Sequence, residues 1–493
     1  MGVVRRQGIK NTIVGYFGLM IGFLNLIIVQ PHFLTKEEIG LTRILYSFSL
    51  LVAMFVPMGI GNATLKYFPV FKDKEKNHHG YFAFMNLFPL LGFVLASVLI
   101  WLLRDFIMNQ YRRESPLFLE YFNYVYPLIF FNSFIAVLSV YCNANYKSTI
   151  PSFLNDVVVR LLTMAVVTIY FNKWLTLDQF ILAFTAIYAI QFVILLGYIF
   201  AFDRPGFSID WKMIREKHMF QLIRYGLLLW FANVASIGLK YFDSIMIGKY
   251  KPLEFVGIYT IAAFIPTVIE IPLNAFDRIA SAKISFAWQA NDHKQINQIY
   301  HTSALYMFLL GAFLFLNINV NIHSLLQFLP DGYQQGESVV LIISIGTLYN
   351  MATGLNAAVL FTSDKYRYGA VYLILLAIIV LAFQMIFIPL YGLEGAALAT
   401  AGASMIYNSM LFVTVYRFFK LQPFDSKNLK VLLLVIIIFS ITFFLPHFKN
   451  LYLDIAIRTS VVSGLFLGAV YFLKIVPEVA EAIISKAKSS SGN

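Results

Sequence analysis

The sequence predicts an all-α integral membrane protein with about fourteen transmembrane helices, forming two six-helix lobes in parallel repeat plus two C-terminal helices. The prediction rests on composition, the number of long apolar runs and an internal repeat. Of the 493 residues, 59% are hydrophobic and 13% are charged, against about 45–50% and about 25% in soluble proteins. No soluble interior can bury so much apolar surface. Composition therefore excludes a soluble enzyme, a nucleic-acid-binding protein and a disordered protein.

Apolar runs of spanning length recur along the chain. One spanning helix needs about 20 residues, and the polar connections between the runs are short, the longest covering residues 203–217. No connection could form an extramembrane domain, so any transport takes place in or at the edge of the bilayer. The predicted spans cover residues 11–33, 41–65, 81–103, 121–143, 150–171, 178–201, 220–247, 255–280, 300–322, 337–361, 368–389, 394–416, 429–445 and 452–473.

The distribution of basic residues predicts that both chain ends are cytoplasmic. With this orientation, 25 of the 37 Lys and Arg lie in cytoplasmic segments, 8 in external connections and 4 within spans. Cytoplasmic loops of membrane proteins carry such an excess. The net charge of +12 follows from this bias and requires no nucleic acid or other polyanionic partner.

Four matches at a spacing of 216–218 residues indicate an internal repeat. EEIGL at residues 37–41 matches EFVGI at residues 254–258, and three further pairs follow: Lys66 with Lys283, Lys147 with Lys365, and Asp178 with Glu394. We expect an N-terminal lobe over residues 1–203, a second lobe over 204–420, and two appended spans and a tail over 421–493. Six helices per lobe give both copies the same orientation, which is typical of secondary transporters with a site between the lobes.

Several motifs resemble those of polysaccharide flippases. Residues 388–400 (IPLYGLEGAALAT) resemble the IPxYGixGAAlAT segment of that family, as do residues 243–248 and 256–259. With Gly40-Leu41 and the fourteen-span layout, these motifs make the chain similar to the Wzx-type oligosaccharide flippases of the MOP superfamily. The resemblance covers nearly the whole chain. It implies two six-helix lobes that move lipid-linked oligosaccharides from the inner to the outer leaflet.

The resemblance also implies the cytoplasmic (inner) membrane as location, a polyprenyl-pyrophosphate-linked sugar as substrate, and membrane lipids and polysaccharide assembly proteins as partners. We expect no cofactor or metal, because the sequence has no nucleotide-binding loop or metal-ligand spacing. Transport would draw on a Na⁺ or H⁺ gradient or on the membrane potential. The alternatives are a lipid II flippase and a cation-coupled multidrug antiporter of the same superfamily. A membrane-embedded polymerase or glycosyltransferase is disfavoured, because no connection is long enough or carries suitable carboxylates or histidines.

Three basic residues within the spans are candidate ligands of an anionic head group: Arg43, Arg160 and Lys240. A charge in a span costs about 2.5–3.5 kcal/mol on insertion scales, so it is a functional candidate by default. A phosphate cannot cross hydrocarbon unpaired, and a guanidinium binds phosphate oxygens in pairs. Snorkelling to the membrane interface is the alternative for Arg43.

Acidic residues at helical spacing suggest a second interpretation, local ion pairing on one helix. It applies to Asp156 with Arg160 and to Lys240 with Asp243, and we expect it for Asp454 with Arg458. Asp156, Asp243 and Glu270 are also candidates for ion coupling, because burial can bring the titration of a carboxylate to physiological pH.

Helix breakers in two spans are candidate hinges. Each proline removes a backbone hydrogen bond and favours a kink, and spans two and eight are equivalent in the repeat. Static kinks that only shape the bundle are the alternative. The candidate hinge residues are Pro57, Gly59, Gly61, Pro266 and Pro272.

Overall fold

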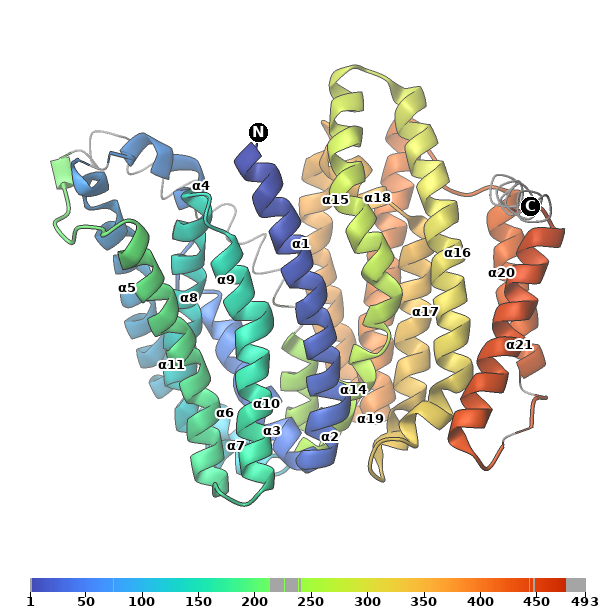
Figure 1. Cartoon of the computed structure of the whole chain (residues 1–493), viewed down its shortest axis with the longest axis horizontal. Coiled ribbons are helices and arrows are strands. Elements are labelled where there is room, and N and C mark those ends of the chain that lie inside the picture. The colour runs from blue at the N-terminus through green and yellow to red at the C-terminus, as the bar shows by residue number, and fades with distance from the viewer. Residues whose placement is uncertain are drawn as a thin grey trace, which may run out of the picture. The chain divides into compact units, whose positions relative to one another are not determined.

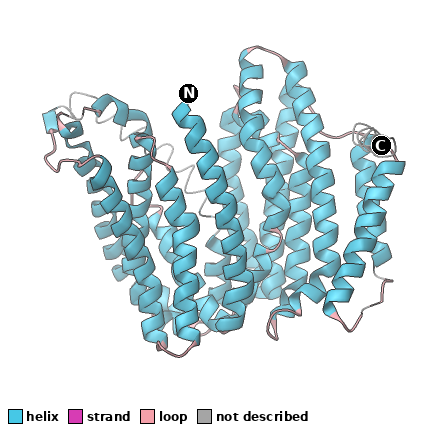
Figure 2. Ribbon diagram, viewed as in Figure 1, coloured by secondary structure: helices cyan, strands magenta, loops and turns pink. Residues whose placement is uncertain are grey.

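The chain folds into helices throughout its described parts. The computed structural model describes residues 2–73, 75–212, 226, 238, 241–442, 444–446 and 448–475. All regular structure among these residues is helical, as Figure 2 shows, which confirms the predicted all-α class. Contacts divide the chain into two compact units, Met1–Thr260 and Ile261–Asn493.

The first unit is built around α8 (Val125–Ala144; Figure 1). This helix packs against α3 (Lys36–Ala53), α4 (Ile60–Phe71), α5 (Tyr81–Leu102) and α11 (Leu177–Phe202). Of the 20 residues of α8, those buried include Leu128, Ser133 and Tyr141. The other helices of this unit are α1 (Gly2–Phe23), η1 (Leu24–Val29), α2 (Gln30–Phe33), η2 (Asn77–Gly80), α6 (Arg104–Tyr111), α7 (Pro116–Glu120), η3 (Phe122–Tyr124), α9 (Thr149–Phe153), η4 (Leu154–Val158), α10 (Val159–Phe171) and α14 (Leu253–Phe264), the last crossing into the second unit.

The second unit is built around α16 (His293–Leu326). This helix packs against α15 (Thr267–Gln289), α17 (Glu337–Thr353), α20 (Ser426–Thr442) and α21 (Leu451–Phe472). The remaining elements are η5 (Tyr333–Gly336), α18 (Asn356–Phe361) and α19 (Tyr366–Phe419). The 54 residues of α19 contain two predicted spans, and Gly392 between them has a φ of 60°, a value that glycine adopts without steric cost.

The described helices account for most predicted spans. Eight of them are long and apolar enough to cross a membrane, or nine with the pair α14 and α15, which is bent by 49°. α3 and α4 share one predicted span, α19 holds two, and α17 and α20 have 17 residues each. The predicted span at 220–247 lies mostly outside the described residues. The chain is therefore a multi-pass membrane protein, whereas the count of fourteen is not confirmed.

The surface of α5 illustrates how these helices suit a bilayer. Tyr81 and Met85 are fully buried within the unit, whereas Leu91, Leu95 and Trp101 are 60–67% exposed. In water such an apolar face would be a severe liability. In lipid it is the expected outward face of a spanning helix, whose backbone groups are satisfied internally.

A hydrogen-bonded turn ties two connections of the first unit together. Asn77, His78 and His79 have φ values of 49–54°, a left-handed conformation that costs about 1–3 kcal/mol per non-glycine residue. The backbone N–H of Asp73 donates to His78 Nδ1 (3.0 Å), so the proton lies on Nε2 and is donated to Asp203 (3.0 Å). The Asp203 carboxylate also accepts from the hydroxyl of Tyr141. These bonds hold the strained turn in place.

The contacts do not test the predicted lobes. Along the chain, the first compact unit ends at Thr260 and the second begins at Ile261. The boundaries predicted from the repeat, at 203/204 and 420/421, describe which segments correspond in sequence and not how they pack. They stay a prediction.

Candidate functional site

Arg43 is carried by α3, whose start is firmly defined. Thr35 and Glu38 form a capping box, with Glu38 N–H donating to Thr35 Oγ1 (3.2 Å) and Thr35 N–H donating to Glu38 Oε2 (2.8 Å), which satisfies two N–H groups that the helix cannot. The other Glu38 oxygen accepts from the hydroxyl of Tyr170 on α10. The first turn of α3 is thereby anchored to a second helix, and Arg43 follows one turn later.

Arg160 lies in α10, directly after the π-helical segment η4. Its Nη1 donates to the carbonyl of Gly18 on α1. Space for this bond comes from two glycines four residues apart on α1: a Cβ at Gly22 would lie 1.8 Å from Arg160 Nη1, and one at Gly18 would lie 2.7 Å from the carbonyl oxygen of Asp156. π-Helical bulges occur frequently at functional sites.

The alternative interpretation of Asp156 and Arg160, a local ion pair, is not formed. Asp156 lies within electrostatic range of Arg160, but no ion pair joins the two side chains in this described segment. Asp156 accepts instead from Asn155 Nδ2 (3.2 Å), and the guanidinium reaches across to α1. Because the charge is not neutralised on its own helix, the interpretation of Arg160 as a ligand gains support.

The two arginines converge on Tyr46. This ring lies within electrostatic range of both Arg43 and Arg160, stacks on Tyr188 (centroids 5.3 Å apart) and meets Tyr241 edge-on (6.2 Å). We call these five residues the Arg/Tyr cluster. Arg43 Cζ lies 6.0 Å from the centroid of Tyr241, within cation–π range. All five belong to the first unit.

The cluster has capacity for an anion. Arg43 Nε is buried and, among the described residues, has no hydrogen-bond partner, although buried polar groups are normally satisfied. A guanidinium offers five donors in a fixed fork that suits phosphate, and tyrosine hydroxyls can donate beside it. The arrangement can therefore bind a phosphate oxygen within a mostly apolar unit.

The other charged residues singled out in the sequence have partners of their own where the structure describes them. Lys240 is outside the described residues. Asp243 accepts from the hydroxyl of Tyr259 (2.8 Å), and Glu270, in the second unit, accepts from Asn350 Nδ2 (3.3 Å). Asp454 and Arg458 form the expected pair at 3.0 Å, with exposures of only 1% and 4%.

The breaks in spans two and eight differ in kind. α3 ends at Ala53 and α4 begins at Ile60, and Met58 and Gly59 between them have φ values of 47° and 80°. Gly61 lies within α4. In span eight the 49° bend falls between Phe264 and Thr267, beside Pro266.

Pro272 lies inside α15, which continues through it, and its role as a hinge stays a prediction. A single missing backbone hydrogen bond is tolerated where neighbouring helices support a spanning helix.

Sequence reasoning missed the tyrosines and the two glycines on α1. The Gly18/Gly22 spacing is the small-xxx-small pattern of close helix contacts in membranes, and could have been found. The tyrosines carry no local signal, because they come from spans far apart in the chain.

The family model described as "Polysaccharide biosynthesis protein" matches residues 4–282, more than half of the chain. The chain belongs to this family. A membrane protein of Methanocaldococcus jannaschii, described as uncharacterized, is 21% identical to this family member over 95% of the chain and 96% of its own length. The Arg/Tyr cluster lies wholly within the matched segment.

Solved structures show the fold of this polysaccharide biosynthesis protein. The lipid II flippase MurJ in an inward closed conformation matches with a TM-score of 0.74 at 15% identity, over 94% of this chain and 98% of that chain. An inward-facing multidrug resistance MATE family transporter of the MOP superfamily matches with a TM-score of 0.65 at 12% identity, over 84% and 98%. At these identities the likeness concerns the fold alone.

Proposed function

We propose that this chain is a flippase that moves lipid-linked oligosaccharide, carried on a polyprenyl pyrophosphate, from the inner to the outer leaflet by alternating access. The observation that carries the proposal is a pair of half-buried arginines on helices of one unit. Arg43 has a buried Nε without a partner among the described residues, and Arg160 reaches across to the carbonyl of Gly18. A buried cation costs several kcal/mol unless it has a partner, so a cation within a span is a functional candidate. A pyrophosphate needs cations of this kind in order to leave water. The polyprenyl tail can stay in lipid while only the head group crosses. The chain would act as a transporter and not as an enzyme.

Family membership supports the same conclusion, since the chain belongs to a polysaccharide biosynthesis family. The solved neighbours include a flippase of lipid II and drug transporters, so both classes share the fold. A cationic cluster favours an anionic glycolipid over a cationic drug by simple charge complementarity. Lys240 completes the proposed set of cations.

The proposed setting is the cytoplasmic membrane with both chain ends inside the cell, because the basic residues concentrate on that side. Polysaccharide assembly proteins are the proposed partners. Coupling to Na⁺ or H⁺ would use Asp156, Asp243 or Glu270, each of which accepts a hydrogen bond from an uncharged side chain.

The test is complementation in cells depleted of the protein, with glycolipid measured in each leaflet. Arg43→Ala and Arg160→Ala should each lower transport roughly 10- to 100-fold, the cost of about 1.5–3 kcal/mol for a lost charge-assisted hydrogen bond. Lys replacements should restore only part of the transport activity, because an ammonium group lacks the bidentate fork of a guanidinium. Arg104→Ala is the matched control, since Arg104 is exposed outside the predicted spans.

Full transport by both alanine variants at normal abundance would contradict the proposal. Binding of cationic dyes, and not of the anionic glycolipid, by the purified protein would replace it with the drug-antiporter alternative.

A further inference from the structure

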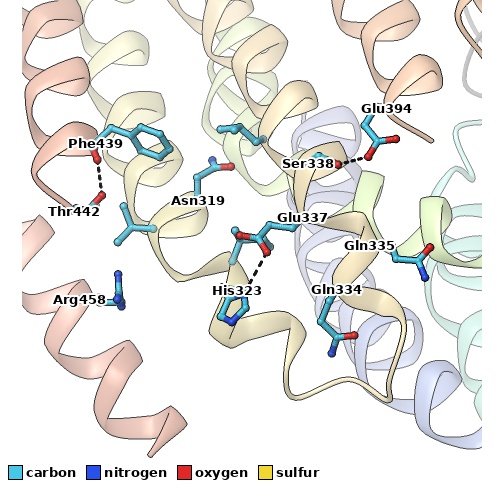
Figure 3. Close-up of a pocket in the computed structure, with 13 residues that line it drawn as sticks. Asn319, His323, Gln334, Gln335, Glu337, Ser338, Glu394, Phe439, Thr442 and Arg458 are labelled. Carbon is cyan, nitrogen blue, oxygen red and sulfur yellow. Dashed lines mark hydrogen bonds and ion pairs between the residues drawn. The ribbon is translucent and has the colours of Figure 1, made fainter. Parts of the chain in front are cut away.

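The second unit contains a polar cavity at one end of its bundle, separate from the Arg/Tyr cluster. Its volume is about 590 Å³, within the range of about 300–1,000 Å³ typical of small-molecule sites. Five α-helices contribute to it: the end of α16, the start of α17, α19 just after its bend, the end of α20 and the start of α21, together with η5. Figure 3 shows polar side chains gathered around this space, among them Asn319, His323, Gln335, Glu337, Glu394 and Arg458.

Two of the lining residues are buried polar groups on spanning helices. Asn319 is 7% exposed and Arg458 is 4% exposed. Asn319 Nδ2 donates to the carbonyl of Phe315 on its own helix (2.9 Å), whereas its Oδ1 has no partner among the described residues. A buried acceptor without a donor destabilises the protein. A ligand hydroxyl in the cavity would supply that donor.

The guanidinium of Arg458 is held in one orientation. Its Nε donates to both Asp454 oxygens (3.1 and 3.0 Å), and Nη2 donates to the carbonyls of Leu445 and Pro446 (3.0 and 3.1 Å). Asp454 also accepts from Ser324 Oγ (2.6 Å) on α16. The charge is thus largely neutralised, but the group stays fixed at the cavity wall as a pre-oriented donor, which limits the entropy lost on binding.

The carboxylates in the cavity already have donors. Glu337 Oε2 lies 3.3 Å from His323 Nδ1, and Glu394 Oε1 accepts from Ser338 Oγ (2.8 Å), as the dashed lines in Figure 3 mark. Two carboxylates against one neutralised guanidinium disfavour a pyrophosphate or another polyanion. Each carboxylate keeps free lone pairs, which accept readily from hydroxyl groups.

The combined chemistry suits a neutral ligand rich in hydroxyl groups. Amides and carboxylates can accept hydrogen bonds from hydroxyl groups, and amides and a fixed guanidinium can donate to them. A hydroxyl group is both a donor and an acceptor. Phe439, on the same wall, adds an apolar ring face against which C–H groups can pack. We propose that this cavity binds sugar residues of the transported glycan, and that the appended helices α20 and α21 exist in part to complete it. The inference rests on the proposed function and names a second subsite, for the sugars, distinct from the anion site.

The experiment uses purified full-length protein in detergent. The probe is the oligosaccharide released from the cell's own glycolipid pool by mild acid and labelled with a fluorophore at its reducing end, so that it carries no lipid and no phosphate. We expect saturable binding that Asn319→Leu weakens at least tenfold and Gln335→Ala weakens several-fold. Asn317→Leu is the matched control two residues away, since Asn317 accepts from Ser463 on α21 (3.2 Å) and does not line the cavity. Inorganic pyrophosphate should not compete, and Arg43→Ala should bind the free glycan normally.

Unchanged binding by both Asn319→Leu and Gln335→Ala, or equal competition by pyrophosphate, would overturn this inference. If the free glycan does not bind but Arg43→Ala still abolishes glycolipid transport, the sugar site is wrong and the flippase proposal stands. If the free glycan binds at the cavity while the glycolipid is not transported, the flippase proposal fails.

Discussion

Gly40 and Gly257 make reciprocal contacts where α3 crosses α14. A Cβ at Gly40 would lie 1.9 Å from the carbonyl oxygen of Leu253, and one at Gly257 would lie 2.1 Å from the carbonyl oxygen of Lys36. Leu253 precedes Gly257 by four residues, as Lys36 precedes Gly40. The two glycines are 217 positions apart, the spacing of the repeat. The predicted repeat makes these positions equivalent, and a reciprocal contact of this kind is what a two-fold relation between the two copies would produce.

This crossing predicts that neither glycine tolerates a side chain. Gly40→Ala and Gly257→Ala should each lower transport several-fold and by similar amounts, because each methyl group would overlap a backbone carbonyl that cannot move aside. Gly464→Ala, at a position with nothing within 4 Å of the added Cβ, should transport normally. A wild-type rate in either crossing variant, measured by glycolipid transport in cells, would show that the contact is not needed during the cycle.

The same crossing is the predicted external gate. Spin labels at 40 and 257 would not fit, so we place them on the exposed, repeat-related Glu37 and Glu254. We expect the distance between the labels to increase when substrate and ions drive the outward-facing state, as spans one and two leave spans seven and eight. A pair at Glu37 and Lys173, both in the predicted N-terminal lobe over residues 1–203, should not change. A constant 37–254 distance under all conditions would argue against alternating access at this position.

Gly22 is predicted to set the position of Arg160. In Gly22→Ala the new methyl group would lie 1.8 Å from Arg160 Nη1, so the guanidinium must leave the carbonyl of Gly18. We expect a loss of transport approaching that of Arg160→Ala, with normal abundance. Gly15 lies two helical turns earlier on α1, and nothing lies within 4 Å of a Cβ added there. Gly15→Ala should therefore behave as wild type. Equal transport by the two variants would mean that this hydrogen bond has no role.

At the break in span two, substitution of Gly59 and of Gly61 by alanine should change stability in opposite directions. Gly59 has a φ of 80°, so Gly59→Ala should destabilise the protein by about 1–2 kcal/mol. Gly61 is helical, and a Cβ there would meet only Val140 at an ordinary 3.5 Å, so Gly61→Ala should be neutral or stabilising by up to about 1 kcal/mol. Thermal unfolding of the purified variants in detergent would measure both. A stable Gly59→Ala variant would show that the break straightens easily.

The fold class could be predicted because the lipid environment requires it. Long apolar runs have one structural solution in a membrane, and the 217-residue spacing that relates Gly40 to Gly257 is written in the sequence. The site was predicted in part. Arg43 and Arg160 were found because a charge in a span is conspicuous, but their convergence on Tyr46 depends on how separate helices pack.

Helical spacing alone also gave mixed results. It correctly predicted the Asp454–Arg458 pair, which forms through Nε while Nη2 donates to two backbone carbonyls. It suggested the same for Asp156 and Arg160, where the glycines of α1 bring a backbone carbonyl within reach instead. No rule based on one helix could distinguish the two cases.

The left-handed turn at residues 77–80 limits where this polypeptide can be cut. Its partner Asp203 lies 125 positions beyond His78, and Asp210 N–H donates to the His79 carbonyl (3.1 Å). An N-terminal fragment ending before Asp203 would keep the local bond to Asp73 but would lose the bonds to Asp203 and Asp210 that help hold three strained residues. Co-expressed halves, used for split-protein complementation, should therefore be divided after Asp210 and not at the end of α11.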